Sequence, residues 1–390
     1  GLIRTLKEGT QAWTEFEAGM AEVRTLMLDK QPMAEMRKEL ELLSSQTGQT
    51  LDKLTKAKYD AVSAGFTSAA DSAMLLNTAS KLAVGGVTDV STSMDLLTSA
   101  LNAYGLEASD SMQVSDQLFT AVRIGKTTIS ELAASLGTVM PVANLAKLRL
   151  QDVGAAMAVL TTGGLNSQIA STALRASLMA LVNPSREAAD AMKNQGIEIK
   201  RLDDGSMDLL ATMSQFKDMD AGLLTKIVPN VRAIVGISRF KDSLEGIDDA
   251  VNAMAESLRN NATKEAFEEM NQTARVQFNR LRQNVNSIKM AFGKVVIDAI
   301  APFVKDFNTE MEKLQMIGMA DVGKILSDDP TILLEYMRKL GNNMGRMLRL
   351  SFRKATNSVT EGVPSAIRGM VEKLPSIFLQ ISYEIGAGVL

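Results

Sequence analysis

Residues 267–299 read FEEMNQTARVQFNRLRQNVNSIKMAFGKVVIDA, and this stretch decides the fold class. Its apolar side chains recur in steps of three and four residues, which is the spacing of one face of an α-helix. We call this apolar stripe the seam, and its members are Phe267, Met270, Ala274, Phe278, Leu281, Val285, Ile288, Phe292, Val295 and Ala299. Because the seam is narrower than the apolar face of a helix that docks on a globular domain, it favours self-association as a coiled coil.

The first 48 residues carry a shorter stripe of the same kind. Its members are Trp13, Phe16, Met20, Val23 and Met27. Pro32 interrupts the pattern, which then resumes at Met33. The segment 1–48 is therefore expected to form two amphipathic helices. Since the stripe is shorter than the roughly three heptads that indicate a coiled coil, it is expected to pack within the chain.

Residues 49–245 have a different texture, with short helical segments separated by Gly, Ser, Asn and Pro. Such punctuation is typical of a compact bundle of short helices. Thr128 and Glu131 have the spacing of a capping box, in which each side chain accepts a hydrogen bond from the other residue's backbone amide. Ser109 and Ser185 stand at expected N-caps as well.

Two local patterns refine this picture. Ala170, Ala173 and Ala176 place small side chains along one helix, which predicts the close approach of a neighbouring helix. Apolar and charged residues alternate from Ile197, and a turn signal follows at Gly205, which predicts one β-hairpin at about 197–207.

The expected fold class is all-α: a multi-helix bundle of short helices flanked by long amphipathic or coiled-coil helices, with at most that one hairpin. The composition agrees, because 46% of the 390 residues are hydrophobic, only 4% are aromatic and 24 are Met, a mixture that favours helices. The expected segments are the N-terminal helices 1–48, a helical core 49–245, a long coiled-coil-forming helix 246–310 and an amphipathic segment 311–390.

The segment 311–390 is basic at first and apolar at its end, where it stops abruptly, as an excised part of a longer chain would. One face carries Arg338, Lys339, Arg346, Arg349, Arg353 and Lys354. A helix of this kind can lie on a membrane or on a protein partner. The competing interpretation is a solvated helix within an assembly.

The sequence contains neither Cys nor His, which excludes disulfides, ordinary zinc sites and catalysis by thiolate or imidazole. We therefore expect no catalytic residue, no cofactor and no metal, and a protein that is not an enzyme. The formal net charge of -3 gives no surplus of cations for general binding to nucleic acid.

Several motifs resemble the core region of the phage tail tape measure protein family. The likeness rests on residues 100–106 (ALNAYGL), 113–116 (QVSD), 128–132 (TISEL), 152–158 (DVGAAMA) and 171–175 (STALR). Family members typically have Gly at the position of Ser171. The motifs lie between Leu82 and Ile199 and include no catalytic signature.

The resemblance implies a structural virion protein that lies inside the tail tube, sets tail length during assembly and is released at DNA ejection. It also implies a homo-oligomer, by family resemblance a trimer, located in the tail and in the host cytoplasm during assembly. The implied partners are tail tube proteins, distal tail hub or baseplate proteins and tail assembly chaperones, with a transient contact to the host membrane and no specific nucleic acid.

Two other functions compete with this one. A helical membrane-active or secreted interaction protein would use the basic face between Arg338 and Lys354. A hydrolase is disfavoured, because the chain lacks the His and Cys of metallopeptidases and thiol peptidases.

Overall fold

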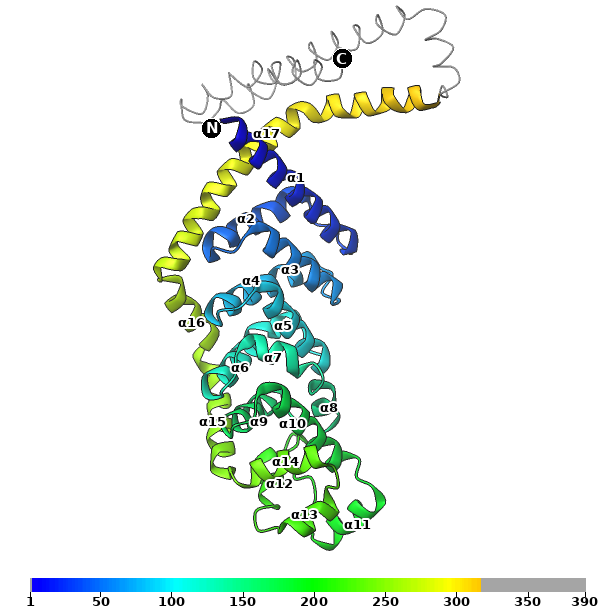
Figure 1. The fold of residues 1–390 in the computed structure, drawn as a ribbon, viewed down its shortest axis with the longest axis vertical. Coiled ribbons are helices and arrows are strands. Elements are labelled where there is room, and N and C mark those ends of the chain that lie inside the picture. Colours follow the sequence, from blue (N-terminus) through cyan, green and yellow to red (C-terminus); the bar gives the residue numbers. More distant parts are fainter. Residues whose placement is uncertain (1, 317–390) are drawn as a thin grey trace, which may run out of the picture. The chain divides into compact units, whose positions relative to one another are not determined.

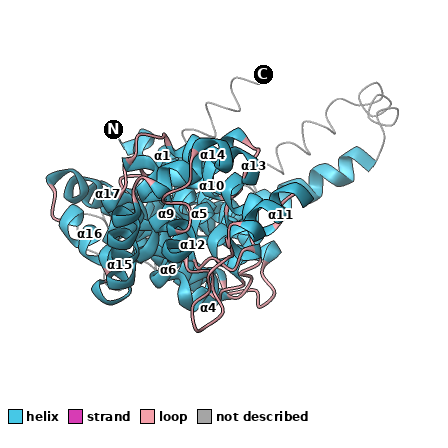
Figure 2. Cartoon of the chain, turned by 90° about the horizontal axis from the view of Figure 1, so that it is seen from below, coloured by secondary structure: helices cyan, strands magenta, loops and turns pink. Residues whose placement is uncertain are grey.

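A computed structural model describes residues 2–316, which form seventeen α-helices and one 3-10 helix and contain no strand. Figure 2 shows these helices and the loops that join them. The all-α fold class is therefore confirmed. The chain divides into two compact units, Phe16–Asn284 and a second unit that joins Gly1–Glu15 to the chain from Val285 onward. Helix α1 (Leu2–Leu26) and helix α17 (Ala274–Met316) each contribute to both units.

The N-terminal stripe is buried, as expected. Trp13, Phe16, Met20, Val23 and Met27 are all shielded from solvent. Helix α2 (Met33–Thr47) begins directly after Pro32, and its apolar side chains, among them Met36 and Leu40, are buried too.

Helical hairpins of similar length follow one another along the larger unit. The paired helices are α2 with α3 (Leu51–Ser63), α4 (Ala69–Gly85) with α5 (Val90–Tyr104), α6 (Ser111–Ile124) with α7 (Ile129–Leu136), and α9 (Leu150–Thr162) with α10 (Ser167–Val182). The second helix of each pair starts at an N-cap, and these caps recur about every 39 residues, at Thr50, Asp89, Thr128 and Asn166. We call these four pairs the hairpin array.

The array has two layers, because the first helices of the pairs (α2, α4, α6, α9) contact one another in series and the second helices (α3, α5, α7, α10) do the same (Figure 1). Stacking of this kind buries a continuous core between neighbouring repeats.

Hydrogen bonds join successive hairpins near the N-termini of their second helices. The hydroxyls of Thr88 and Ser130 lie 2.7 Å apart, and so do those of Thr127 and Ser167. At the opposite ends of the second helices, the side-chain amide of Asn102 donates to the backbone carbonyl oxygen of Ala64 at 2.9 Å.

Two short helices lie between elements of the array: η1 (Ala108–Asp110) before α6, and α8 (Met140–Leu145) before α9. Four more follow α10, namely α11 (Arg186–Asn194), α12 (Leu209–Ser214), α13 (Ala221–Ile227) and α14 (Val231–Lys241). Helix α14 packs on α10 through Gly236, where an added Cβ would lie 2.9 Å from the carbonyl oxygen of Ala173. The Ser177 hydroxyl donates to the Ala233 carbonyl oxygen at 3.2 Å. The small residues of α10 thus allow the close approach that the sequence predicts.

The hairpin expected at 197–207 is reduced to a single antiparallel bridge between Arg201 and Met207. Its turn exists, with Gly205 at φ +79 and a bond from the Leu202 amide to the Ser206 carbonyl oxygen. One more bond joins the arms, from the Asp208 amide to the Lys200 carbonyl oxygen, while the Met207 amide donates to the Lys147 carbonyl oxygen of the array. Because Asp208 is also the N-cap of α12, the second arm continues as a helix and no ladder grows.

The single long helix expected over 246–310 is three helices: α15 (Leu244–Asn260), α16 (Ala262–Asn271) and α17. Asn261 separates the first two by adopting a left-handed conformation with φ +46, which no helix interior contains. A second break follows at Gln272 and Thr273, so the seam is divided between α16 and α17.

The capping box is confirmed: the Thr128 amide donates to Glu131 Oε2 at 2.9 Å, and the Glu131 amide donates to Thr128 Oγ1 at 3.2 Å. Ser185 caps α11 as expected. The cap expected at Ser109 is wrong, because Ser109 lies inside η1, where Glu107 and Asp110 form the box instead.

Candidate functional site

The outward face of α17 is the clearest candidate for a contact surface. Phe278, Leu281, Val285 and Ile288 are 70%, 57%, 44% and 56% exposed. They follow one another at intervals of three, four and three residues along α17, the first two in the larger unit and the last two in the smaller unit. We call these four residues the exposed stripe.

The rest of the seam is placed less uniformly. Phe267 and Met270 lie on α16 and are partly buried, as are Phe292 and Val295 on α17, while Ala274 is exposed. Ala299 belongs to α17, and its side chain falls outside the described residues. The structure therefore leaves the middle of the seam open to solvent and covers parts of its ends.

Cations line one side of the exposed stripe. Arg275, Arg282 and Lys289 follow one another at intervals of seven residues, and no acidic residue occurs between positions 270 and 297. Glu8 lies 3.7 Å from the Lys289 ammonium group and partly compensates its charge. The other side carries the neutral, exposed amides Gln277 and Asn284.

The opposite face of α17 is buried through Val276 and Met290. In the smaller unit this face crosses α1 where Gly9 and Gly293 meet, and a Cβ on Gly9 would overlap the carbonyl oxygen of Lys289. This second apolar face was not predicted from the sequence, although Val276 and Met290 lie two heptads apart, because the seam on the same helix has the more regular spacing.

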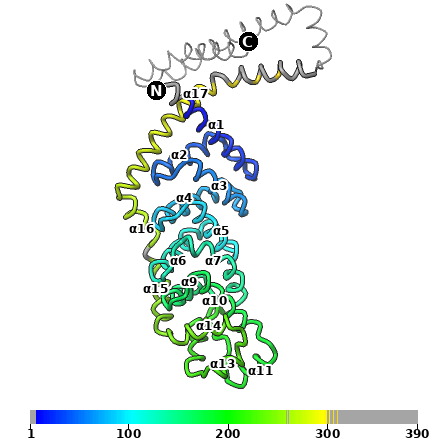
Figure 3. Tube along the Cα trace, in the orientation of Figure 1, coloured from blue at the N-terminus to red at the C-terminus, as the bar shows by residue number. Residues whose placement is uncertain are grey.

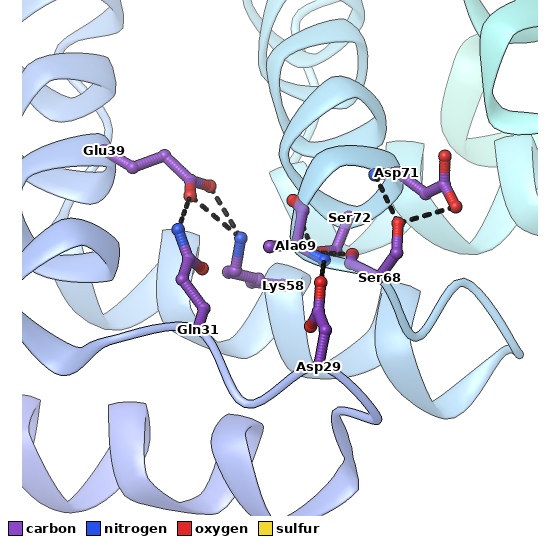
Figure 4. A network of polar contacts seen from close by, with 8 residues as sticks. All are labelled: Asp29, Gln31, Glu39, Lys58, Ser68, Ala69, Asp71 and Ser72. Atoms are coloured by element: carbon purple, nitrogen blue, oxygen red, sulfur yellow. Dashed lines mark hydrogen bonds and ion pairs between the residues drawn. The ribbon is translucent and has the colours of Figure 1, made fainter.

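The most buried charge in the described residues is Lys58 on α3, whose side chain is 0% exposed (Figure 4). Its ammonium group lies 2.7 Å from Glu39 Oε1 and 3.0 Å from Oε2 on α2. Gln31 donates to the same carboxylate at 3.1 Å, and Asp29 accepts from the Ala69 amide at 2.8 Å. Burial lowers the pKa of Lys58, and the neighbouring Glu39 carboxylate opposes that shift.

The position of Lys58 in the array explains this network. Each second helix has a fully buried residue eight positions after its N-cap; these residues are Lys58, Leu97, Leu136 and Leu174. The first hairpin has a Lys where the other three have Leu. Its charge is satisfied by α2 and by the loop between α1 and α2, so the network fastens the start of the array and is structural in character.

Two buried carboxylates are engaged in structural bonds as well. Asp152 accepts two bonds from the Arg149 guanidinium group, at 2.7 and 3.0 Å. Burial raises the pKa of Asp152, against the opposing effect of Arg149. Asp116 on α6 accepts from the Thr263 backbone amide at 2.8 Å.

Among residues 2–316 no three acidic side chains gather in a way that could hold a metal ion, and none of the helices there is long and apolar enough to cross a membrane. The basic face between Arg338 and Lys354 lies outside the described residues.

Comparison with known proteins identifies the family. Residues 37–268 match the model of the phage-related minor tail protein family. The tape measure protein of Pneumococcus phage Dp-1 is 22% identical over 319 residues, which cover 80% of this chain and 27% of that protein. The probable tape measure protein of Clostridium phage phiCD119 is 30% identical over 159 residues, which cover 40% of this chain and 17% of that protein.

The chain thus spans no more than about a quarter of the length of these two relatives. No solved structure matches it. Since the family match covers more than half of the sequence and includes the hairpin array from residue 37 onward, the chain belongs to the phage-related minor tail protein family, to which tape measure proteins belong.

Proposed function

We propose that this chain is a structural segment of a tape measure protein, which lies in the lumen of a phage tail, helps to set the tube length during assembly and leaves ahead of the DNA at ejection. The family match over residues 37–268 carries this proposal. The hairpin array adds a refinement: because its helices fold back on one another, they add little length, so this segment acts as a folded anchor of the ruler and not as its extended shaft.

Copies of the chain associate, in this proposal, through the exposed stripe of α17. The stripe has heptad spacing, with Phe278 and Val285 at the a positions and Leu281 and Ile288 at the d positions. Ile at d is typical of trimers, whereas Val at a with Leu at d is typical of dimers, so the trimer in this proposal follows from the family resemblance.

The charges beside the stripe support a parallel arrangement. In parallel helices Gln277 and Asn284 would face Arg282 and Lys289 of the neighbouring copy, which pairs neutral amides with cations. Antiparallel helices would bring the cationic sides together, and like charges at such positions repel.

The proposed partners beyond a second copy are tail tube proteins, distal tail hub or baseplate proteins and tail assembly chaperones, with a transient contact to the host membrane at ejection. The proposed location is the virion tail, and the host cytoplasm during assembly. These proposals follow from family membership alone.

The test is quantitative mass spectrometry of tails purified from the phage that encodes this chain, before and after DNA release is triggered with the host receptor. Peptides from residues 37–268 should be abundant in intact tails, at a fixed ratio to tube protein, and depleted after release. Their absence from intact tails would contradict the structural role, and their full retention after release would contradict the ejection step.

A further inference from the structure

The chain reverses direction after α14, and its next helices return along one layer of the hairpin array. Helix α15 contacts α9 and α6, and α16 contacts α6 and α4, all of which are first helices of their pairs (Figure 3). The first turns of α17 reach α2, where the Arg280 side chain donates to the Ser45 carbonyl oxygen at 2.8 Å. We call residues 244–284 the strap.

The strap meets the array at glycines. A Cβ on Gly154 of α9 would lie 2.8 Å from the terminal methyl carbon of Met254, and one on Gly85 of α4 would lie 3.0 Å from the Ala266 Cβ. Met254 and Ile247 are fully buried against the array, whereas Asp248 and Asp249 on the other side of α15 are exposed. The strap therefore docks by one face only.

Helix α16 cannot complete its own N-terminus. Asn261, at the cap position, has φ +46 and makes no side-chain capping bond. The cap comes from α6, where Asp116 Oδ1 accepts from the Thr263 amide at 2.8 Å, and the Ser115 hydroxyl lies 2.9 Å from the Thr263 hydroxyl. Asp116, Ser115 and Thr263 are all buried.

This arrangement couples the folding of α16 to its docking. An α-helix leaves its first amides unpaired unless a side chain satisfies them. Because Asp116 belongs to the array, the Thr263 amide loses its partner when the strap lifts. The same movement would return the Asp116 carboxylate, whose pKa is raised by burial, to water.

The junction between α16 and α17 is incompletely packed. A pocket of about 490 Å³ lies there, lined on the array side by Lys53, Val87 and Asp89 and on the strap side by Met270 and Arg275. The strap is therefore loosely packed only at this junction, while α15 and α16 lie closely against α9 and α4.

We propose that the strap is a releasable layer that opens as one unit while the hairpin array stays folded, and that Asp116 holds it in register. Opening would separate residues 244–284 from the array without unfolding the rest of the larger unit. This inference concerns the isolated chain and does not depend on the proposed tail function.

The test is hydrogen exchange of the full chain followed by mass spectrometry. In the wild type, peptides from 244–271 should exchange faster than peptides from α5 and α10. In Asp116→Ala the strap peptides should exchange about tenfold to a hundredfold faster still, the range expected for losing a buried hydrogen bond to a charged group, while the array peptides stay unchanged.

A matched control is Asp220→Ala, which removes the cap bond to the Leu223 amide at 2.9 Å and should affect only α13. Because the chain has no Cys, Gly85→Cys with Ala266→Cys introduces one pair that can be oxidised. The disulfide should slow exchange in the strap, and reduction should restore it.

Two results would overturn the proposal. The first is equal protection of the strap and of α5 in the wild type. The second is loss of protection in α5 and α10 together with the strap in Asp116→Ala, which would mean that the larger unit opens only as a whole.

Discussion

The chain carries two apolar stripes with the same spacing and opposite surroundings. The N-terminal stripe, which runs from Trp13 on α1 to Met27 just after that helix, is buried throughout, whereas four consecutive members of the stripe on α17 are exposed. The difference arises because α17 has a second apolar face, through Val276 and Met290, that makes its contacts within the chain. Heptad spacing thus identifies a helix and one of its faces, but whether a stripe is covered depends on what the opposite face binds.

The difference between the two stripes is tested most directly by making the same substitution, Phe to Ala, on each of them. Phe16→Ala removes a buried ring and should lower the free energy of unfolding by about 3–5 kcal/mol. Phe278→Ala removes a ring that is 70% exposed and should change it by no more than about 0.5 kcal/mol. Urea denaturation of dilute protein measures both. Equal losses would show that the two stripes do not differ.

The network around Lys58 explains why the N-terminal helices stay in place, since it ties the loop after α1 to α2 and α3. Glu39→Ala leaves the Lys58 ammonium group buried without its carboxylate and should cost about 3–5 kcal/mol in the same assay. Glu35→Ala, on the exposed side of α2, is the control and should cost little.

Lys58→Leu combined with Glu39→Leu should recover most of this loss, because Leu occupies the equivalent position in the other three hairpins. A double variant no more stable than Glu39→Ala would show that the site needs its charges.

The crossing of α1 and α17 gives a smaller expected effect. Gly9→Ala places a methyl group against the backbone of α17 and should destabilise the chain by about 1–3 kcal/mol. Gly137→Ala is the matched control, since nothing lies within 4 Å of an added Cβ there and its φ of -54 suits Ala, so stability should rise by about 0.4–1 kcal/mol. Equal thermal shifts in the two variants would argue against a tight crossing.

The smallest effect is the pH dependence at Lys58. Its folded-state pKa lies below the ordinary 10.5, so the unfolded chain holds the proton over a range in which the folded chain has lost it. The wild type should therefore gain stability relative to Lys58→Met as the pH rises toward 10.5, by at most about 1.4 kcal/mol per pH unit. A stability difference between the wild type and Lys58→Met that falls as the pH rises would contradict this sign.

Much of the local structure could be predicted from the sequence. Helix starts with a Ser or Thr cap were found at Thr128 and Ser185, because the cap and its helix are neighbours in the chain. Ser109 failed because Glu107 and Asp110 compete for the same turn. The hairpin expected at 197–207 is reduced to one bridge because Asp208 caps α12 and so ends the second arm.

Long-range features were harder to find. The repeat was visible in principle as a cap about every 39 residues, from Thr50 to Asn166, but its core positions tolerate both Lys and Leu, so sequence similarity between hairpins is weak. Asp116 and Lys58 look like ordinary surface charges in the sequence. Only the fold brings Thr263 and Glu39 to them.

The central functional claim is that the exposed stripe of α17 joins copies of the chain, and sedimentation velocity across a range of protein concentrations tests it most directly. The wild type should associate as the concentration rises. Phe278→Asp combined with Ile288→Asp should stay monomeric with unchanged helix content, and Asn284→Asp, which adds an acidic group beside the stripe where a neighbour's Lys289 would lie, should still associate. A wild-type chain that stays monomeric at every concentration, or a double variant that associates as the wild type does, would contradict the claim.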